Sequence, residues 1–323
     1  MQIETIQAPV APFLESFREQ YNAVLQSKSE WLTIAIDHLY SSNGKQLRPL
    51  FMGLMASLFT DELPKETVEV AVVLELIHTA TLIHDDVIDD SDERRGNATL
   101  NTLYYNNVAV LMGDYILTSA IKKAIEVGDL MILSKISELG KQLTEGEIIQ
   151  YETAEKVILD EKVYFEVIHE KTAALFITCA EIAVHTVNAS REETEKCKRV
   201  AELFGYAFQI RDDIFDYYDH NVGKPTGNDI REGKITLPLL HALEVADSDV
   251  SREIRQLLHQ KKFSAGDIHK IISFAKENGG IEYAREKMET FLNEAKNILK
   301  EFPDSKYRSS LLQMADYISY RKI

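Results

Sequence analysis

The sequence predicts an all-α protein, a single-domain bundle of long helices joined by short loops. Turn-forming residues are scarce, since the 323 residues include 14 Gly and 7 Pro, about half of their usual share. No Pro lies between Pro64 and Pro225, and Pro disrupts helix interiors because it lacks a backbone donor. Apolar residues recur every three or four positions, which is the spacing of one helix face.

The helices follow one another with few interruptions. Residues 9–40 carry apolar side chains at helical spacing, and the turn at 41–49 ends at Pro49, which can open a helix. Residues 66–90 are apolar on nearly all faces, as expected of a buried helix. Further helices are expected at 99–127, 129–150, 160–187, 191–218 and, after a loop at 220–229, between 236 and 323 with breaks near Gly266, Gly279 and Pro303.

Composition excludes several classes of protein. The net charge of −16 disfavours nucleic acid and anionic membranes as general partners. Two cysteines, Cys179 and Cys197, form neither a disulfide framework nor a metal motif, which fits a reducing cytoplasm. The N-terminus lacks the pattern of a secretory signal, and we expect no transmembrane segment. Because no low-complexity linker interrupts the chain, residues 1–323 are interpreted as one domain.

Two acidic motifs each end a largely apolar helix. DDVID occupies residues 85–89 and DDIFD residues 212–216. Residues four apart share a helix face, so Asp85 lies with Asp89 and Asp212 with Asp216. Asp86 and Asp213 lie about 100° round the helix. Like charges on one face repel, so such pairs require cations, and carboxylate oxygens suit Mg²⁺.

Basic and polar residues accompany both motifs. Arg94 and Arg95 follow the first motif, and His78 precedes it on the same helix. Lys45 and Arg48 flank the turn before Pro49, Lys171 precedes an apolar helical segment, and Lys224 and Lys234 bracket the loop after the second motif. Arg binds phosphate with two parallel hydrogen bonds, and Lys binds it as a point charge. The pattern therefore favours a site for an anionic, phosphate-containing substrate with metal ions.

With these motifs the chain resembles the trans-isoprenyl diphosphate synthases, or polyprenyl synthetases, over nearly its whole length. The matching segments are DDVID with RRG at 94–96, KT at 171–172, Gln209 with DDIFD, GKPTGND at 223–229 and EGK at 232–234. NGKQLRP at 43–49 is similar to the family's GGKRxRP, with Asn43 and Gln46 as departures. The resemblance implies an isoprenoid-synthase helical bundle around a deep central cavity, and a homodimer.

The resemblance also implies a role for each matching residue. Asp85, Asp86 and Asp89 would hold two Mg²⁺ ions on an allylic diphosphate, and Asp212 a third, helped by Asp213 and Asp216. Arg94, Lys171 and Lys234 would contact that diphosphate, with Lys224 beside it. Lys45, Arg48, His78 and Arg95 would hold isopentenyl diphosphate. Thr172 and Gln209 would stabilise the allylic cation through their oxygen dipoles.

The expected reaction is ionisation of the allylic diphosphate, attack by isopentenyl diphosphate and loss of a proton. The growing chain should pass back along the helix that ends at Asp85, where one turn of about 5.4 Å is close to one isoprene unit. Ala80 and Thr81 are small, which leaves the path open. Ile77 and Leu74 lie deeper, and Met112 or Tyr115 could form a floor. We therefore expect a long product of roughly six to eight or more isoprene units, grown from farnesyl diphosphate and suited to a quinone side chain.

Three alternatives stay open. A twenty-carbon product would make the chain a geranylgeranyl diphosphate synthase. A terpene cyclase would share the fold and the first motif, but the intact DDIFD and the presence of Lys45, Arg48 and His78 argue against it. A non-catalytic subunit is disfavoured because both motifs are complete, although the chain could be the catalytic half of a two-component synthase with a heteromeric partner.

Overall fold

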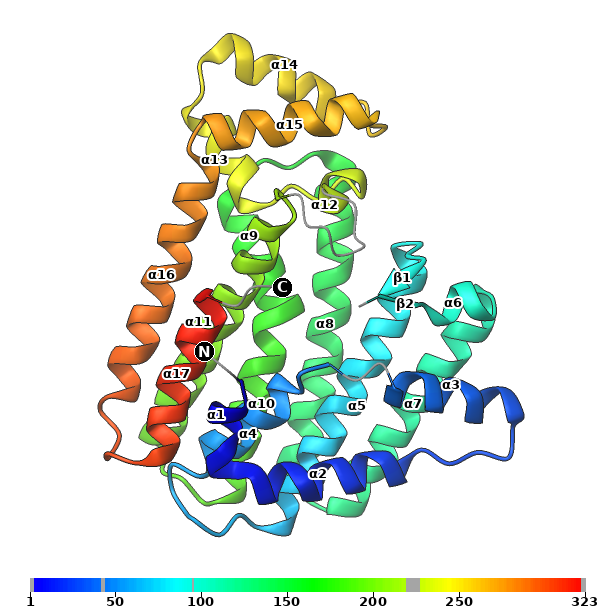
Figure 1. Cartoon of the computed structure of the whole chain (residues 1–323), viewed down its shortest axis with the longest axis vertical. Helices are drawn as coiled ribbons and strands as arrows, with labels where there is room; N and C mark the ends of the chain where they lie inside the picture. Colours follow the sequence, from blue (N-terminus) through cyan, green and yellow to red (C-terminus); the bar gives the residue numbers. More distant parts are fainter. Residues whose placement is uncertain (1–2, 42–43, 95, 219–226, 321–323) are drawn as a thin grey trace. The chain divides into compact units, whose positions relative to one another are not determined.

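The computed structural model describes residues 3–41, 44–94, 96–218 and 227–320 (Figure 1). Arg95 and Lys224 lie outside the described residues. The first helices are α1 (Ile3–Gln7), the 3-10 helix η1 (Ala8–Val10), α2 (Ala11–Val24), α3 (Glu30–Ser41), α4 (Leu47–Ala56), α5 (Lys65–Ile88), α6 (Leu100–Leu103), α7 (Asn106–Val127) and α8 (Leu130–Lys156). The later helices are α9 (Glu161–Ile168), the π-helix η2 (His169–Ala173), α10 (Ala174–Thr186), α11 (Arg191–Phe215), α12 (Asn228–Arg231), α13 (Leu237–Val245), α14 (Ser248–Leu258), α15 (Ala265–Glu277), α16 (Gly280–Leu299) and α17 (Lys306–Tyr320).

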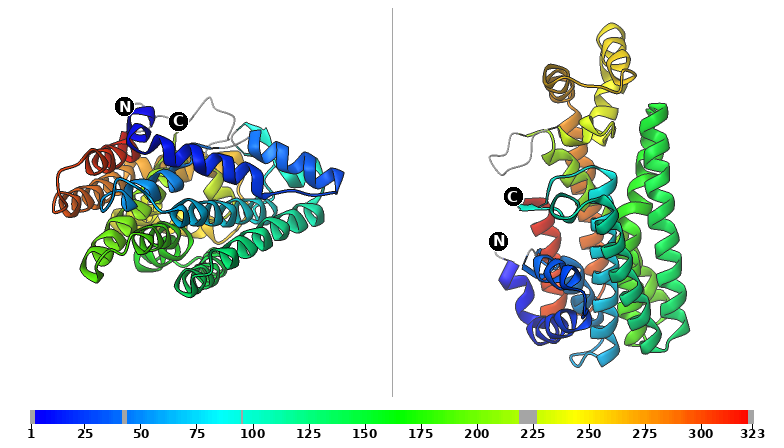
Figure 2. Two further views of the ribbon diagram at one scale, coloured as in Figure 1. Left: turned by 90° about the horizontal axis from the view of Figure 1, so that it is seen from below. Right: turned by 90° about the vertical axis from the view of Figure 1, so that its right-hand side faces the viewer.

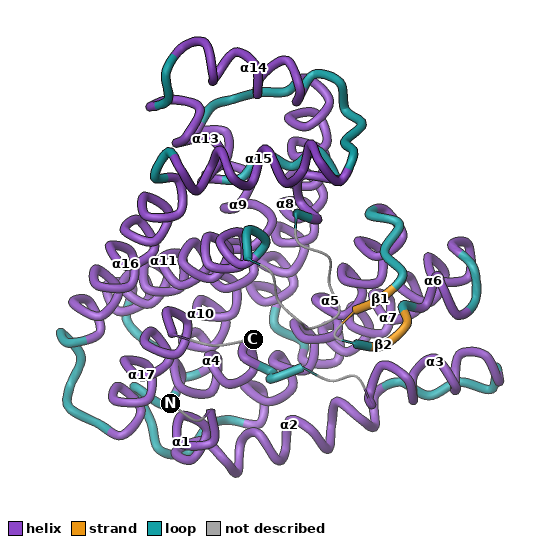
Figure 3. The backbone as a smooth tube through the Cα atoms, turned by 45° about the horizontal axis from the view of Figure 1, so that its top comes forward, coloured by secondary structure: helices purple, strands orange, loops and turns teal. Residues whose placement is uncertain are grey.

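The all-α prediction is confirmed (Figure 3). In the described part of the chain the strands are β1 (Glu93–Arg94) and β2 (Asn97–Ala98), an antiparallel pair that the sequence analysis did not anticipate. The expected helix at 160–187 is divided by η2. The expected helix at 99–127 is broken before α7 at Tyr105, whose φ of 140° lies outside the helical region.

The described helices fall into two compact units, and neither unit is one continuous segment. Unit 1 comprises Met1–Glu138, Thr178–Lys198 and Lys300–Gln313. Unit 2 comprises Leu139–Ile177, Arg199–Leu299 and Met314–Ile323. Because the chain passes repeatedly from one set to the other, α8, α10, α11 and α17 contribute residues to both units. The interpretation of 1–323 as one domain stays a prediction.

Unit 1 is organised around α5. Helices α2, α4 and α7 pack against it, and α7 runs beside it in the views of Figure 2. Lys123 of α7 donates to Glu69 of α5 at 2.8 Å. By length and composition α5 could also cross a membrane, but 72% of its apolar window is buried within the protein. This burial is what a core helix requires, and it fixes the position of the aspartates at the end of α5.

Unit 2 has its own apolar core, in which α13 packs against α9, α15 and α16. A ring cluster ties α9 to two other helices of this unit. Phe165 of α9 meets Tyr206 of α11 at a centroid distance of 5.8 Å and Phe291 of α16 at 5.9 Å. Such edge-to-face packing adds specific geometry to apolar burial. The cluster thereby holds α9 in place, together with the π-helix that follows it.

Candidate functional site

The first aspartate motif lies at the C-terminal end of α5 in unit 1. Asp85 and Asp86 belong to the last turn, whereas Asp89 is the residue that caps the helix. The Asp89 N–H still donates to the Asp85 carbonyl at 2.8 Å, so both lie on one turn, as predicted. Asp86 is buried, with 6% exposure. The end of α5 therefore carries one buried carboxylate and two that are more accessible.

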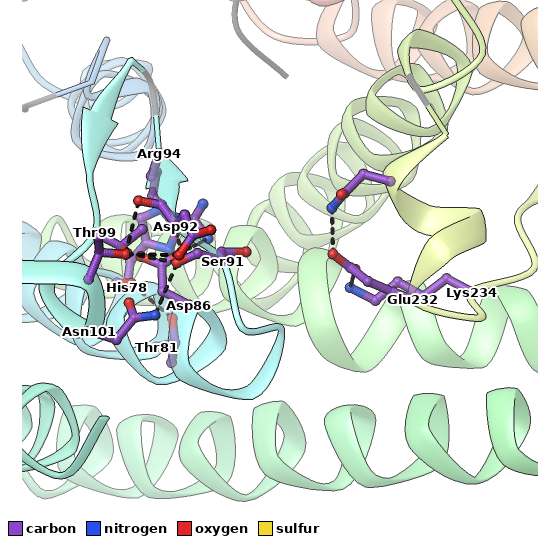
Figure 4. Close-up of polar contacts among 12 residues, drawn as sticks. His78, Thr81, Asp86, Ser91, Asp92, Arg94, Thr99, Asn101, Glu232 and Lys234 are labelled. Carbon is purple, nitrogen blue, oxygen red and sulfur yellow. Dashed lines mark hydrogen bonds and ion pairs between the residues drawn. The ribbon is translucent and has the colours of Figure 1, made fainter. Parts of the chain in front are cut away.

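The β1–β2 hairpin places the Arg94 guanidinium beside the buried Asp86 carboxylate (Figure 4). Nε and Nη2 of Arg94 lie 2.8 Å and 2.7 Å from Oδ1 of Asp86. The carbonyl of Ser91 accepts from the Thr99 hydroxyl at 2.7 Å and from Asn101 Nδ2 at 3.0 Å, which anchors the segment leading into the hairpin. The structure thus brings together two residues that the sequence analysis selected separately.

Two of the residues expected on isopentenyl diphosphate also meet in unit 1. Nη1 of Arg48 on α4 lies 2.8 Å from Nε2 of His78 on α5. Lys45 is exposed in the segment before α4. Gln46, which departs from the family pattern, accepts from Nε of Arg18 at 3.1 Å, so a cation of α2 lies beside it. Arg95 cannot be placed, since it is outside the described residues.

The residues proposed to limit product length lie on α5 and α7. Ala80, Ile77 and Leu74 are buried on α5, and Met112 is buried on α7. The Thr81 hydroxyl donates to its own helix, to the His78 carbonyl at 2.9 Å. Tyr115 is only half-buried, and its hydroxyl donates to the Gln26 carbonyl at 2.5 Å. The buried α5 positions and Met112 are therefore core positions, whereas Tyr115 points its polar end at a loop.

In unit 2 the π-helix η2 contains Lys171 and Thr172. A π-helix inserts one extra residue per turn and often occurs at functional sites. Two glycines allow neighbouring helices to approach it closely. A Cβ on Gly146 of α8 would lie 2.8 Å from Cβ of Glu170, and one on Gly205 of α11 would lie 2.5 Å from Cα of Ala173. The π-helix is therefore held between two backbones.

A cavity of about 120 Å³ adjoins this π-helix within unit 2. Five residues selected from the sequence share it: Lys171, Thr172, Gln209, Asp213 and Lys234. The remaining lining residues are Gln150, Thr153, Ala154, Ile158, Asp160, Tyr164, Val167, Ile168, Asp229, Ile235, Thr236 and Leu240. The cavity therefore combines apolar walls with a few convergent polar groups, which is typical of a ligand site.

Four of the polar lining residues form a continuous hydrogen-bond chain. The Thr172 hydroxyl donates to Oε1 of Gln209 at 2.7 Å, and Nε2 of Gln209 donates to Oδ1 of Asp213 at 2.8 Å. The Tyr164 hydroxyl donates to Oδ2 of Asp213 at 2.6 Å. Burial raises the pKa of Asp213 to about 7, whereas these two hydrogen bonds lower it. Burial also raises the pKa of Tyr164 well above its usual value, so its hydroxyl stays a donor.

The other aspartates of the second motif have different surroundings. Asp212 is half-exposed, and its Oδ1 lies 3.3 Å from Nη1 of the buried Arg211. Asp216 follows the last residue of α11 and accepts backbone N–H bonds from Asn228 at 2.9 Å and Asp229 at 3.1 Å. Asp216 therefore anchors the start of α12, and Asp212 is the most exposed carboxylate of the motif.

Each described lysine of the cavity is paired with a glutamate. Nζ of Lys171 lies 2.5 Å from Oε2 of Glu147 and 3.3 Å from Oε1 of Gln150. Nζ of Lys234 lies 2.5 Å from Oε2 of Glu232 (Figure 4). Both ion pairs are less than one quarter exposed. An anionic ligand would therefore compete with these carboxylates for the lysines.

The donors at both motifs fit Mg²⁺. No group of three or more His, Cys, Asp or Glu side chains among the described residues is arranged to hold a metal by itself. Mg²⁺ usually takes one or two protein carboxylates and completes its shell with water and substrate phosphates. The motifs offer carboxylate oxygens only, the hard ligands that Mg²⁺ prefers.

Sequence reasoning missed Tyr164, Glu147 and Glu232. Glu232 stands two residues before Lys234, and that proximity could have indicated their pairing. Glu147 lies on a helix rich in charged residues, so nothing distinguished it. Tyr164 lies 49 residues from Asp213 along the chain, and only the fold brings them together.

Comparisons with known proteins give the same identification. The family model for polyprenyl synthetase matches residues 29–275. The octaprenyl diphosphate synthase of Escherichia coli strain K12 is 34% identical over 280 residues, 86% of each chain. The crystal structure of a polyprenyl synthase from Caulobacter crescentus CB15, complexed with calcium and isoprenyl diphosphate, has a TM-score of 0.93 and 27% identity, covering 99% and 98% of the two chains. The crystal structure of geranylgeranyl pyrophosphate synthase from Bacteroides thetaiotaomicron has a TM-score of 0.85 and 36% identity over 98% of each chain. This chain therefore belongs to the polyprenyl synthetase family, whose members are prenyltransferases.

Proposed function

We propose that the protein is a Mg²⁺-dependent trans-prenyltransferase that condenses isopentenyl diphosphate with an allylic diphosphate, farnesyl diphosphate by preference, to give a long all-trans polyprenyl diphosphate. One observation carries the proposal. The five residues that share the unit 2 cavity were selected from sequence motifs as diphosphate, cation and metal residues. Unit 1 supports it independently, since Arg94 forms an ion pair with Asp86 and Arg48 forms a hydrogen bond with His78.

The chain's residues would divide the chemistry as follows. Lys171, Lys234 and Arg94 bind the allylic diphosphate, with Lys224 as a further cation. Lys45, Arg48, His78 and Arg95 bind isopentenyl diphosphate. Asp85, Asp89 and Asp212 would hold Mg²⁺, with Asp86, Asp213 and Asp216 in support, and three ions are expected with a diphosphate bound. Mg²⁺ supplies Lewis-acid stabilisation of negative charge on the leaving diphosphate.

The allylic carbon–oxygen bond breaks and its electron pair leaves with the diphosphate. The oxygens of Thr172 and Gln209 face the positive charge that develops on carbon, which is the kind of preorganised electrostatic stabilisation that lowers a barrier most. The double bond of isopentenyl diphosphate then attacks the cation to form the new carbon–carbon bond. A proton is lost from the product to the released diphosphate. The apolar cavity walls exclude water, which would otherwise capture the cation.

Product length is a separate part of the proposal. Small, buried side chains at Ala80 and the apolar run through Ile77 to Leu74 support a long chain, and the octaprenyl diphosphate synthase relative agrees with this. A twenty-carbon product is the second candidate, and the likeness to a geranylgeranyl pyrophosphate synthase favours it. We further propose that the protein is a homodimer. We also propose the cytoplasm as its compartment, because both cysteines are buried and unpaired.

The test is to incubate the pure protein with farnesyl diphosphate, labelled isopentenyl diphosphate and Mg²⁺, and to separate the dephosphorylated products by length. A ladder ending at one long species supports the proposal, and EDTA should abolish it. A single twenty-carbon species would replace the long-chain assignment. Hydrocarbons formed without isopentenyl diphosphate would identify a cyclase. The absence of all products, with or without a candidate partner subunit, would contradict the proposed activity.

A further inference from the structure

The buried carboxylate of Asp213 is the fixed point of the unit 2 hydrogen-bond chain. It is 3% exposed and both of its oxygens accept hydrogen bonds, one from Tyr164 and one from Gln209. Because both Asp213 oxygens act as acceptors here, they determine which end of the Gln209 amide faces them. The NH₂ group is turned toward Asp213, and the amide oxygen is turned toward Thr172.

The direction of the chain continues through Thr172. Because the Gln209 oxygen accepts the Thr172 hydroxyl proton, the remaining lone pairs of Oγ1 are directed away from Gln209. Both residues line the cavity. Each dipole thus has its positive end toward Asp213 and its negative end away from it, and dipoles aligned in this way strengthen one another in a low-dielectric interior.

Tyr164 holds the Asp213 carboxylate, toward which these dipoles are aligned. Its hydroxyl holds the second oxygen of Asp213 at 2.6 Å, and its ring is buried against Phe165 at a centroid distance of 5.3 Å. It stands on α9, the helix that leads directly into the π-helix carrying Thr172. Both ends of the hydrogen-bond chain are therefore fixed to one short stretch of backbone.

We propose that Tyr164 is a positioning residue that acts through Asp213 to orient the Gln209 and Thr172 oxygens toward the developing allylic cation. The inference rests on the proposed prenyltransferase function. Without the Tyr164 hydroxyl, only the hydrogen bond from Gln209 holds the Asp213 carboxylate. The carboxylate can then rotate, and the Gln209 and Thr172 dipoles lose their common direction. Outer-shell partners of metal-binding side chains typically contribute about 10- to 100-fold to activity, and we expect an effect of that size here.

The experiment compares Tyr164→Phe with Tyr206→Phe. Both changes keep an aromatic ring next to Phe165, but Tyr206 hydrogen-bonds to His169 and Glu202 instead of Asp213. The first readout needs no substrate or metal: the side-chain amide resonance of Gln209 in protein labelled with ¹⁵N-glutamine, assigned by its loss in Gln209→Glu. The second readout is kcat and KM for both substrates. Asp213→Asn, which can donate where the carboxylate only accepts, is the second variant.

We expect the Gln209 amide resonance to move in Tyr164→Phe and Asp213→Asn and to stay in place in Tyr206→Phe. We expect kcat to fall roughly 10- to 100-fold in Tyr164→Phe with little change in either KM. An unmoved resonance, or an unchanged kcat, in an otherwise active protein would overturn the inference and leave the proposed function intact. If the wild-type protein elongates nothing, the proposed function is overturned, and the positioning role with it.

Discussion

Lys171 and Glu147 form an ion pair of 2.5 Å beside the unit 2 cavity, where a diphosphate is proposed to bind. Their side chains are 23% and 16% exposed, so water screens the pair only in part. The carboxylate opposes an incoming diphosphate in two ways, since it occupies the ammonium group and repels the like charge. Binding of the substrate therefore requires the exchange of one anion for another.

Changing Glu147 to Gln should lower the KM for the allylic diphosphate. The repulsion of the diphosphate by this partly screened charge is worth about 1 kcal/mol, so its loss should lower the KM roughly fivefold. The control is Glu138→Gln, because Glu138 is also a glutamate of α8 paired with a lysine, Lys135 at 2.9 Å, but Lys135 does not line the cavity as Lys171 does. The KM of each variant is measured by steady-state kinetics at varied concentrations of the allylic diphosphate. A raised KM would mean that Glu147 serves to hold Lys171 in its binding position.

Asp85→Asn and Asp212→Asn should each lower kcat by about a hundredfold or more, because each removes a carboxylate proposed to hold Mg²⁺ near the leaving diphosphate. Asn keeps the size of the side chain, so far-UV circular dichroism should not change. Asp90→Asn is the matched control, since Asp90 is the exposed neighbour of the first motif and Asn tolerates its positive φ of 48°. Turnover near the wild-type value in either test variant would exclude the proposed metal sites.

Ala80→Phe should shorten the product. Ala80 is 1% exposed on α5, and a ring there would extend into the apolar path proposed for the growing chain. Overpacking a core typically costs about 1–3 kcal/mol, so the melting temperature is measured in parallel with the product length. An unchanged product distribution in a folded variant would refute the assignment of Ala80 as a length-limiting residue.

Gly205→Ala should destabilise the protein and reduce its activity. Its new Cβ would lie 2.5 Å from the backbone of Ala173, so the π-helix that carries Lys171 and Thr172 must move. Gly140→Ala on α8 is the control, because no heavy atom lies within 4 Å of its new Cβ, and it should stabilise the helix by up to about 1 kcal/mol. Thermal unfolding measures both, and equal melting temperatures would contradict the close packing of the π-helix.

The sequence was sufficient for features that depend on local pattern. Apolar spacing and the lack of Pro predicted the helices α5, α8 and α11, and the repeated acidic motif predicted where two of them end. The π-helix could not be predicted, because the close approach of Gly146 and Gly205 to it comes from other helices. For the same reason the bonds from Tyr164 to Asp213 and from Lys171 to Glu147 depend on tertiary packing that no local pattern records.

Helix α5 carries Leu74, Ile77, Ala80 and Asp85 on one uninterrupted backbone. Insertion or deletion of a single residue between Leu74 and Asp85 would rotate one group against the other by about 100° and shift it by about 1.5 Å. The apolar side chains and the acidic end would then no longer serve the same substrate. Along the proposed path, product length can therefore be altered by the size of the side chains on α5, but not by its number of residues.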